Sequence, residues 1–195
     1  MKKFELTSET KINIFGKKLF RIKALVSFGV VKTGETGGWV EKEENVNQSG
    51  DAWVFDNAEV FGNARVFGNS RVFGNAWVFG NARVFGDAWV SDNAEVSDNA
   101  WVSGNARVFD NARVSGNARV FDNADYATIH GFGTQFRTTT FFRCKDKQVK
   151  VSCGCFYGTI PEFCEQVKNT RKGKIAEEYL MIADLMEKHF AEEAK

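Results

Sequence analysis

The side chains best suited to specific binding chemistry are three arginines spaced six residues apart: Arg107, Arg113 and Arg119. Arg137 and Thr138 follow them closely, in a segment that also holds two glycines and two further threonines: Gly131, Gly133, Thr139 and Thr140. Guanidinium groups, hydroxyls and glycine-exposed backbone amides are the groups that bind phosphate. The pattern therefore predicts an anion site, with Arg107, Arg119 and Arg137 on the phosphate.

Two ring-bearing residues complete this candidate site. Trp101 could stack on a base, and His130 lies in the segment that leads to Arg137. The alternative interpretation is that the arginines form salt bridges with Asp110, Asp122 and the acidic residues of the C-terminal segment.

The four cysteines, Cys144, Cys153, Cys155 and Cys164, could support metal or redox chemistry. On a strand, Cys153 and Cys155 share a face, and Cys144 on a paired strand could join them in a zinc site. Their spacing is not that of a zinc ribbon or knuckle, so we expect buried, reduced thiols. Metal binding and redox chemistry stay as alternatives, and no cofactor is expected.

A six-residue repeat from Asp51 to Asp125 must position these groups. The unit reads Asn-Ala-x-Val-(Phe/Ser)-(Gly/Asp), with twelve valines from Val54 to Val120 and one alanine replaced by Ser70. Alanine and valine two residues apart point to the same side of a strand, and Gly/Asp-Asn tolerates the left-handed backbone of a turn. Each unit therefore predicts a short strand and a bend, and three bends close a triangular, 18-residue coil.

A flattened, 12-residue coil of two units is the alternative, because four tryptophans lie on a grid of two units: Trp53, Trp77, Trp89 and Trp101. In the 18-residue coil, cations and aromatics alternate on one face, in the order Trp53, Arg71, Trp89 and Arg107. Eight phenylalanines, from Phe55 to Phe121, follow the inward valines and are expected to lie outward near the corners. So much exposed aromatic surface predicts an interface, and we expect homo-oligomerisation.

The motif Val-x-Gly-Asn-Ala-x-Val resembles the hexapeptide repeat of left-handed β-helix proteins. The resemblance implies a mainly β fold, a left-handed parallel β-helix and assembly as a homotrimer. Many such proteins are acyltransferases, which need a general-base histidine and loops that protrude between coils. Only His130 and His189 are present, both outside the repeats, and the strict register leaves no room for a loop. We therefore expect no enzyme, with an acyltransferase as the less favoured alternative.

Both flanks are expected to cap the open ends of the β-helix. The expected division is an N-terminal β cap over residues 1–50, the β-helix over 51–125 and a small ββαα domain over 126–195. The cap alternates apolar and polar residues around a turn at Phe15–Lys18, which predicts a β-hairpin.

In the C-terminal domain, two strands are predicted on either side of Lys145–Lys147. A first helix is predicted from Thr159, with Pro161 in its first turn, to about Asn169. A final helix is predicted from about Gly173, with one apolar face: Ile175, Tyr179, Ile182, Met186 and Phe190.

The whole chain also resembles a family common in phages and prophages of gut bacteria. The residues that carry this resemblance are LFRIKAL…GGWVEKEENV, the repeats, and TTTFFRCKDK…CGCFYGT…EFCEQV…AEEYLMIADLMEKHF. The resemblance implies a phage or mobile-element origin and brings no established activity.

Composition and charge exclude several classes of protein. The net charge is +1, and the repeats hold 6 arginines against 10 acidic residues, a net charge of −4, so binding to nucleic acid or an anionic membrane is not expected. No apolar run approaches the roughly 20 residues of a membrane span, and the N-terminus shows no signal-peptide core. We therefore expect a protein of the bacterial host cytoplasm.

Together these observations predict a non-catalytic, phage-type binding protein. Its expected ligand is a phosphate-bearing small molecule, such as a nucleotide signal of host defence, bound where the last coil meets the C-terminal domain. The predicted ligand-binding residues are Trp101, Arg107, Arg113, Arg119, His130, Arg137 and Thr138. The alternative is a structural or protein-interaction module whose aromatic faces hold a host or virion protein.

Overall fold

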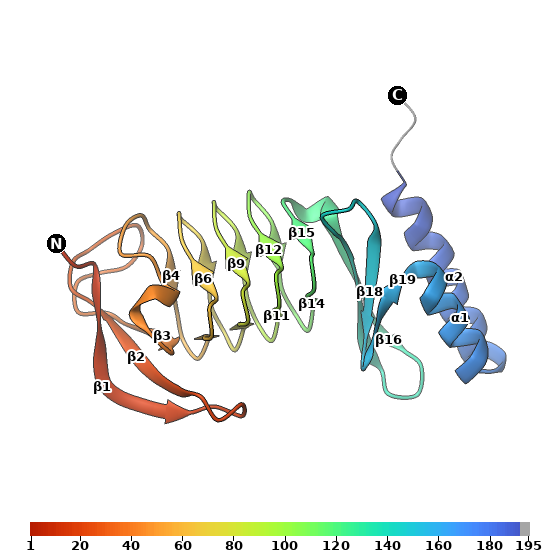
Figure 1. Cartoon of the computed structure of the whole chain (residues 1–195), viewed down its shortest axis with the longest axis horizontal. Helices are drawn as coiled ribbons and strands as arrows, with labels where there is room; N and C mark the ends of the chain where they lie inside the picture. The colour runs from red at the N-terminus through yellow and green to blue at the C-terminus, as the bar shows by residue number, and fades with distance from the viewer. Residues whose placement is uncertain (192–195) are drawn as a thin grey trace.

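A parallel β-solenoid forms the middle of the molecule in the computed structural model, which describes residues 1–191 (Figure 1). Each repeat contributes one two-residue strand, made of the residue after the alanine and the valine that follows it. These strands are β4 (Trp53–Val54), β5 (Glu59–Val60), β6 (Arg65–Val66), β7 (Arg71–Val72), β8 (Trp77–Val78), β9 (Arg83–Val84), β10 (Trp89–Val90), β11 (Glu95–Val96), β12 (Trp101–Val102), β13 (Arg107–Val108), β14 (Arg113–Val114) and β15 (Arg119–Val120).

Each strand pairs in parallel with the strand three repeats further along the chain. Trp53 pairs with Arg71, Arg71 with Trp89, and Trp89 with Arg107. The 18-residue coil is therefore confirmed, and the 12-residue alternative is wrong. The left-handed sense of the coil stays a prediction from the resemblance.

The solenoid has three faces. We name one after the N-terminal β-hairpin that lies against it and one after its arginines, and we call the remaining one the third face. The hairpin face consists of β5, β8, β11 and β14, the arginine face of β6, β9, β12 and β15, and the third face of β4, β7, β10 and β13. Arg107, Arg113 and Arg119 occupy the last position of the third, hairpin and arginine faces respectively. One outward arginine on each face of the last coil is thus confirmed.

Columns of alanine and valine fill the interior: every repeat valine, and every repeat alanine from Ala52 to Ala118, is fully buried. Identical small side chains above one another let the coils approach to the spacing of a hydrogen-bonded sheet. Ser70 takes one alanine position, where its hydroxyl donates to the carbonyls of Phe67 at 2.9 Å and Val84 at 3.1 Å. The one polar interruption of the column is therefore satisfied internally.

The corners require a left-handed backbone, which glycine or aspartate supplies. Gly104 has φ +60°, and Asp98 adopts φ +57° even though it carries a Cβ. The Asp98 carboxylate accepts the backbone N–H of Gly116, in the next coil, at 2.9 Å. A hydrogen bond between coils thus offsets the strain that a non-glycine residue incurs at this angle.

The N-terminal cap contains the predicted hairpin, β1 (Phe4–Ile12) and β2 (Lys18–Ala24), which pair antiparallel. Strand β3 (Thr36–Val40) joins the hairpin to the solenoid, because it pairs with β2 on one side and in parallel with β5 on the other. The short 3₁₀ turn η1 (Glu43–Asn45) follows, and Val46 bridges to Val66. Pairing with the solenoid therefore begins before residue 51.

This cap covers Trp53, which the repeat pattern places on the outside of the coil. The Trp53 side chain is fully buried, with its ring against Phe4 at 5.7 Å and Phe28 at 5.4 Å between centroids. The predicted alternation on the third face is therefore interrupted at its first member. Arg71 instead lies over Trp89, at 5.4 Å from the ring centroid.

Lys3 closes the same end of the solenoid from a buried position. Its ammonium donates to the carbonyls of Gly50 at 3.2 Å and Ala52 at 2.8 Å. Burial lowers the pKa of Lys3 from 10.5 to about 8, against the opposing effect of the Asp51 charge. The folded state therefore favours the neutral amine of Lys3 more strongly than the unfolded state does.

We expect this lysine to make stability depend on pH. Between pH 8 and pH 10.5 the unfolded chain binds more protons on Lys3, so the contribution of this group to stability increases as the pH rises through that window. Lys3→Met removes the titration. The advantage of the wild type over Lys3→Met in free energy of unfolding, measured with urea, should be larger at about pH 10 than at about pH 7. An advantage that is the same at both pH values would contradict the assignment.

The C-terminal domain is a four-stranded antiparallel sheet covered on one side by two helices. Its strands are β16 (Tyr126–Phe132), β17 (Arg137–Arg143), β18 (Val149–Cys153) and β19 (Phe156–Thr159), and its helices are α1 (Ile160–Thr170) and α2 (Gly173–Phe190). The 3₁₀ turn η2 (Asn123–Asp125) connects it to the last coil. Figure 1 shows the sheet between the solenoid and the helices.

The expected ββαα order predicted two strands in this domain, whereas the structure has four. Tyr126–Phe132 forms a strand that was not expected, and the second predicted strand is divided into β18 and β19. Gly154, at φ +63°, makes the tight turn between Cys153 and Phe156, which pair with each other. A glycine that tolerates this angle allows a hairpin where the apolar pattern alone reads as one strand.

Both helices lie close to their predicted bounds. Thr159 caps α1 by accepting from the backbone N–H of Glu162, with Pro161 in the first turn. Tyr179, Ile182, Met186 and Phe190 of α2 are buried as expected, and Ile175 is half-buried. Within residues 1–191, no helix has the length and apolar character needed to cross a membrane.

The repeat phenylalanines lie near the corners as predicted, but they expose less surface than expected. Phe67 and Phe85 stack at 4.9 Å with nearly parallel rings, and Phe61 and Phe79 stack in the same way at 5.1 Å. Among the eight, only Phe109 and Phe121 of the last coil are strongly exposed, at 46% and 48%. Rings that repeat at the coil spacing cover one another, which reduces their exposed surface.

Candidate functional site

Four of the seven predicted ligand-binding residues meet where the last coil joins the C-terminal domain. Arg113, His130, Arg137 and Thr138 line an open hollow of about 540 Å³. Its other lining residues are Asn111, Phe136, Gly154 and Cys155. The junction was predicted from residue types, and the structure brings these four side chains to one place.

Contacts between the solenoid and the sheet position this hollow. Arg113 belongs to β14, and its backbone N–H donates to the Thr140 hydroxyl on β17 at 3.0 Å. The Thr138 hydroxyl lies 3.2 Å from His130 Nδ1 on the neighbouring strand β16. Thr139 and Thr140 are buried, and the Thr139 hydroxyl donates to Cys153 at 3.1 Å. Thr138 is therefore the threonine of this run that faces the hollow.

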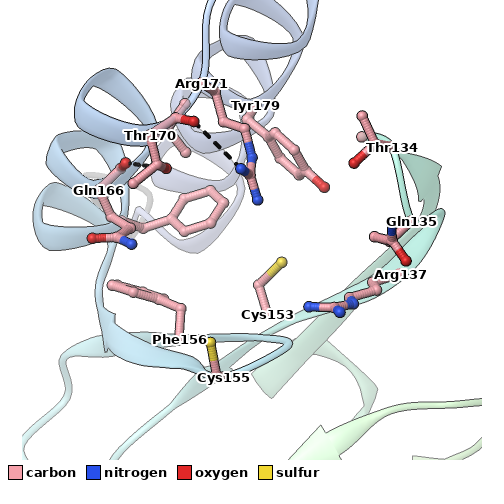
Figure 2. Close-up of a pocket in the computed structure, with 13 residues that line it drawn as sticks. Thr134, Gln135, Arg137, Cys153, Cys155, Phe156, Gln166, Thr170, Arg171 and Tyr179 are labelled. Atoms are coloured by element: carbon pink, nitrogen blue, oxygen red, sulfur yellow. Dashed lines mark hydrogen bonds between the residues drawn. The ribbon is translucent and has the colours of Figure 1, made fainter.

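A second, more enclosed cavity of about 100 Å³ adjoins the hollow and shares Arg137 and Cys155 with it. Figure 2 shows Arg171 and Tyr179 extending from the helices toward Cys153 and Arg137 on the sheet. The remaining walls come from the β16–β17 loop, the β18–β19 hairpin and α1: Gly133, Thr134, Gln135, Phe156, Phe163, Gln166, Val167 and Thr170. Aromatic rings and polar side chains thus face the same small space.

Several hydrogen bonds fix the walls of this cavity. Arg171 donates to the carbonyl of Thr170 at 3.3 Å, and the Thr170 hydroxyl donates to the carbonyl of Gln166 at 2.6 Å. The Tyr179 hydroxyl donates to the carbonyl of Phe132 at 3.2 Å. Burial raises the pKa of Tyr179, so its hydroxyl stays protonated near neutral pH.

The electrostatics of the two hollows favour anions. Arg113, Arg137 and Arg171 line them together with His130, and no aspartate or glutamate is among the described residues that line either one. Arg113 is partly neutralised by Glu95, at 3.1 Å. Arg137 lies against Gly154, where a Cβ would stand 2.5 Å from its Nη1, so glycine leaves the space that the guanidinium occupies.

The other three predicted residues lie elsewhere. Trp101 and Arg119 are neighbours on the arginine face, and Arg107 is exposed on the third face over Trp89, at 4.6 Å. The expected set, with Trp101 on a base and Arg107, Arg119 and Arg137 on the phosphate, is therefore not assembled around one ligand. The six-residue period turns successive outward side chains onto different faces, which separates residues that are close in sequence.

Trp101 is also occupied. Arg83 from the coil before and Arg119 from the coil after lie over its ring, at 5.1 and 4.2 Å from the centroid. Arg119 further donates to the carbonyl of Ala118 at 2.7 Å and that of Asn99 at 2.9 Å. A base could stack on Trp101 only by displacing a guanidinium group.

The expected salt bridges from these arginines to Asp110 and Asp122 do not form between described residues; the partner of Arg113 is Glu95.

The cysteines are dispersed as well. Cys144 lies beyond the end of β17 at the solenoid, where it bridges to Ala118, whereas Cys153 pairs with Thr139 at the other end of that strand. Cys144 therefore does not join Cys153 and Cys155, and residues 1–191 contain no cluster of three or more metal-ligating side chains.

Burial raises the pKa of the Cys144 thiol to about 11 and also raises that of Cys164. These two cysteines are therefore poor nucleophiles near neutral pH. Cys155 is exposed at the tip of the β18–β19 hairpin, and Cys153 is half-buried, so the expectation of buried thiols fails for Cys155.

Sequence reasoning missed Arg171, Gln166 and Tyr179, which complete the enclosed cavity. Tyr179 was assigned only to the apolar face of the final helix, and Arg171 follows the end of α1, where a basic residue commonly offsets the helix dipole. The sequence offered one signal for Arg171: it lies in the short connection between the two predicted helices, and such a connection lies at an edge of the domain.

The repeats match a known family model. The model described as YdcK Beta solenoid repeat matches residues 76–92 and 112–124, both within the solenoid. This supports a β-solenoid repeat protein, in agreement with the fold. No curated protein matches the chain significantly.

Proposed function

We propose that this protein binds a phosphate-bearing small molecule at the junction of the last coil and the C-terminal domain, without catalysing a reaction on it. The observation that carries the proposal is the pair of adjoining hollows, lined by three arginines and a histidine and by no carboxylate of the described chain. Guanidinium groups around a concave surface form bidentate hydrogen bonds with phosphate oxygens.

Each group has a distinct part in this proposal. Arg113 and Arg137 bind the phosphate in the open hollow, and the Thr138 hydroxyl and His130 ring donate to its oxygens. The enclosed cavity receives the uncharged part of the ligand against Phe156, Phe163 and Tyr179. A nucleotide has both parts, an anion and a flat ring, which is why we favour a nucleotide over inorganic phosphate.

The biological setting of the proposal rests on the sequence resemblance. A hexapeptide-repeat protein of a phage or prophage family, acting in the cytoplasm of the bacterial host, would remove a nucleotide signal of host defence by sequestering it. The homotrimer implied by the hexapeptide resemblance belongs to the same proposal. No part of it requires a cofactor.

An acyltransferase is less well supported. Parallel pairing between coils continues without interruption from β4 to β15, so no loop protrudes between coils to form a cofactor groove. His130 lies at the junction, where its ring contacts the Thr138 hydroxyl, and His189 is exposed near the end of α2. Both histidines are therefore away from the spaces between coils, where a general base for acyl transfer would have to act.

Calorimetric titration tests the proposal directly. We expect cyclic dinucleotides or ADP-ribose derivatives to release heat and raise the melting temperature, with inorganic phosphate binding more weakly. Native mass spectrometry of protein purified from its host should show a small mass that denaturation releases. Neither heat nor a thermal shift with any phosphate compound, together with an empty protein in the mass spectrum, would overturn the proposal.

A further inference from the structure

The three faces of the solenoid differ in what covers them. The chain's own β1–β2 hairpin lies against the hairpin face, beneath the first coils in Figure 1, whereas no segment lies in front of β6, β9 and β12 in that view. The arginine face is therefore open over most of its length. Its outward row consists of Arg65, Arg83, Trp101 and Arg119.

The hairpin shows how a polypeptide segment docks on this solenoid. Lys11 of β1 pairs with the outward residue Glu59 at 2.8 Å, and Asn13 donates to the same carboxylate at 3.1 Å. Phe15 at the tip of the hairpin packs on the stacked rings of Phe61 and Phe79, at 5.4 Å from each. Docking thus combines an ion pair to the outward row with an aromatic ring on the phenylalanine stack.

The arginine face repeats this arrangement with the opposite charge and without a cover. Phe67 and Phe85 stack at 4.9 Å in the same way as Phe61 and Phe79 do on the hairpin face. In the outward row, Arg65 and Arg83 stand where the hairpin face has Glu59 and Trp77 respectively. A segment that docks here in the manner of the hairpin would therefore supply carboxylates in place of Lys11.

Arg65 and Arg83 pair directly across the strands β6 and β9, which places two like charges side by side. Like charges in directly opposed positions destabilise a sheet. No described carboxylate forms an ion pair with either arginine, although Glu44 lines the same hollow of about 160 Å³ with them. The fold thus retains a cationic pair without an ion-pair partner among the described residues, next to an aromatic stack.

Each aromatic ring of this face already has a neighbour against at least one of its two sides, which bears on the kind of partner. Trp101 lies between Arg83 and Arg119, and Phe67 and Phe85 cover each other. Single-stranded nucleic acid needs free ring faces for base stacking. Carboxylates need only the outward N–H groups of the guanidinium ions, so the surface suits an acidic polypeptide better than an oligonucleotide.

We propose that the arginine face docks an extended acidic segment of a partner protein, with carboxylates on Arg65 and Arg83 and an aromatic side chain on the Phe67–Phe85 stack. The inference is independent of the proposed phosphate site, because the two surfaces share no residue. It specifies the surface and the chemistry of the protein-interaction role that the sequence suggested as the alternative.

Two short fluorescent peptides test this surface by fluorescence anisotropy. One alternates glutamate with phenylalanine and threonine, and the other has lysine in place of glutamate. We expect the glutamate peptide to bind and the lysine peptide not to. The double variant Arg65→Glu/Arg83→Glu should bind the glutamate peptide about tenfold or more weakly and gain affinity for the lysine peptide. Circular dichroism confirms that the variant is folded.

The variant Arg71→Glu/Arg107→Glu is the matched control, because it makes the same change of charge on the third face. It should leave binding of the glutamate peptide within about twofold of the wild type. Equal losses in both variants, tighter binding of an oligothymidylate to the arginine face, or self-association that the Arg65→Glu/Arg83→Glu variant abolishes would each overturn the proposal. Phosphate titrations on the same variants report separately on the junction.

Discussion

Replacing Gly104 by alanine is expected to lower the free energy of unfolding by about 2–5 kcal/mol. Gly104 lies at a corner with φ +60°, and a Cβ there would overlap the carbonyl oxygen of Phe121 in the next coil. The left-handed angle alone costs roughly 1–2 kcal/mol for a residue with a Cβ. The overlap adds the cost of overpacking, because the obstacle is backbone and cannot rotate away.

The aspartates at other corners explain why alanine is the informative substitution. Asp98 has a similar angle, φ +57°, but its carboxylate accepts the N–H of Gly116 in the next coil. Alanine has the strain of aspartate without this hydrogen bond. The stability lost in Gly104→Ala therefore reports the backbone strain and the steric overlap at this corner, with no new hydrogen bond to offset them.

Urea denaturation of Gly104→Ala and Gly62→Ala separates strain from overlap. Gly62 has φ +69°, and its nearest atom to an added Cβ is the Gly80 oxygen at 3.2 Å, so the matched control carries the strain with little overlap. We expect Gly62→Ala to lose about 1–2 kcal/mol. Equal losses for the two variants would show that the close approach of the last corner to Gly104 does not limit stability.

The second large effect concerns ligand binding. Arg137→Gln is expected to weaken binding of the phosphate ligand about 10- to 100-fold, which corresponds to about 1.5–3 kcal/mol for a charge-assisted hydrogen bond. Arg137 lines both hollows, so it is the one arginine placed to contact the phosphate and the neighbouring part of the ligand together. Glutamine keeps much of the length of the side chain but removes its charge and its bidentate fork.

Arg107→Gln is the matched control for this measurement. Arg107 is an exposed arginine on the third face, and the change removes the same charge away from the junction. Calorimetry should therefore give nearly wild-type affinity for Arg107→Gln. Equal weakening by both substitutions would mean that the ligand senses the overall charge of the protein, and would contradict a built site at the junction.

The repeat allowed most of the solenoid to be predicted. Alanine and valine two residues apart can bury one side of a strand only if the chain bends between units, and Gly/Asp-Asn supplies that bend. Burial of every repeat valine follows from this local chemistry, and the period allowed each strand to pair with the one two or three repeats later; the structure shows three. The helix from Ile160 was equally accessible, because Thr159 and Pro161 are start signals that act within one turn.

The six-residue period therefore specified the short strands, the turns and the buried interior, since these depend on contacts that recur with the period. The choice of 18 over 12 residues per coil, and with it one arginine on each face, came from the pairing of the strands. Which arginines meet depends on how the C-terminal domain packs. Arg113 and Arg137 come together because β17 hydrogen-bonds to the last coil, and Arg171 joins them because α1 and α2 pack on the far side of that sheet. Trp53 and Trp101 have equivalent repeat positions, yet the cap buries one and two arginines enclose the other. Such differences arise from contacts between segments far apart in the chain, which no local pattern of residues encodes.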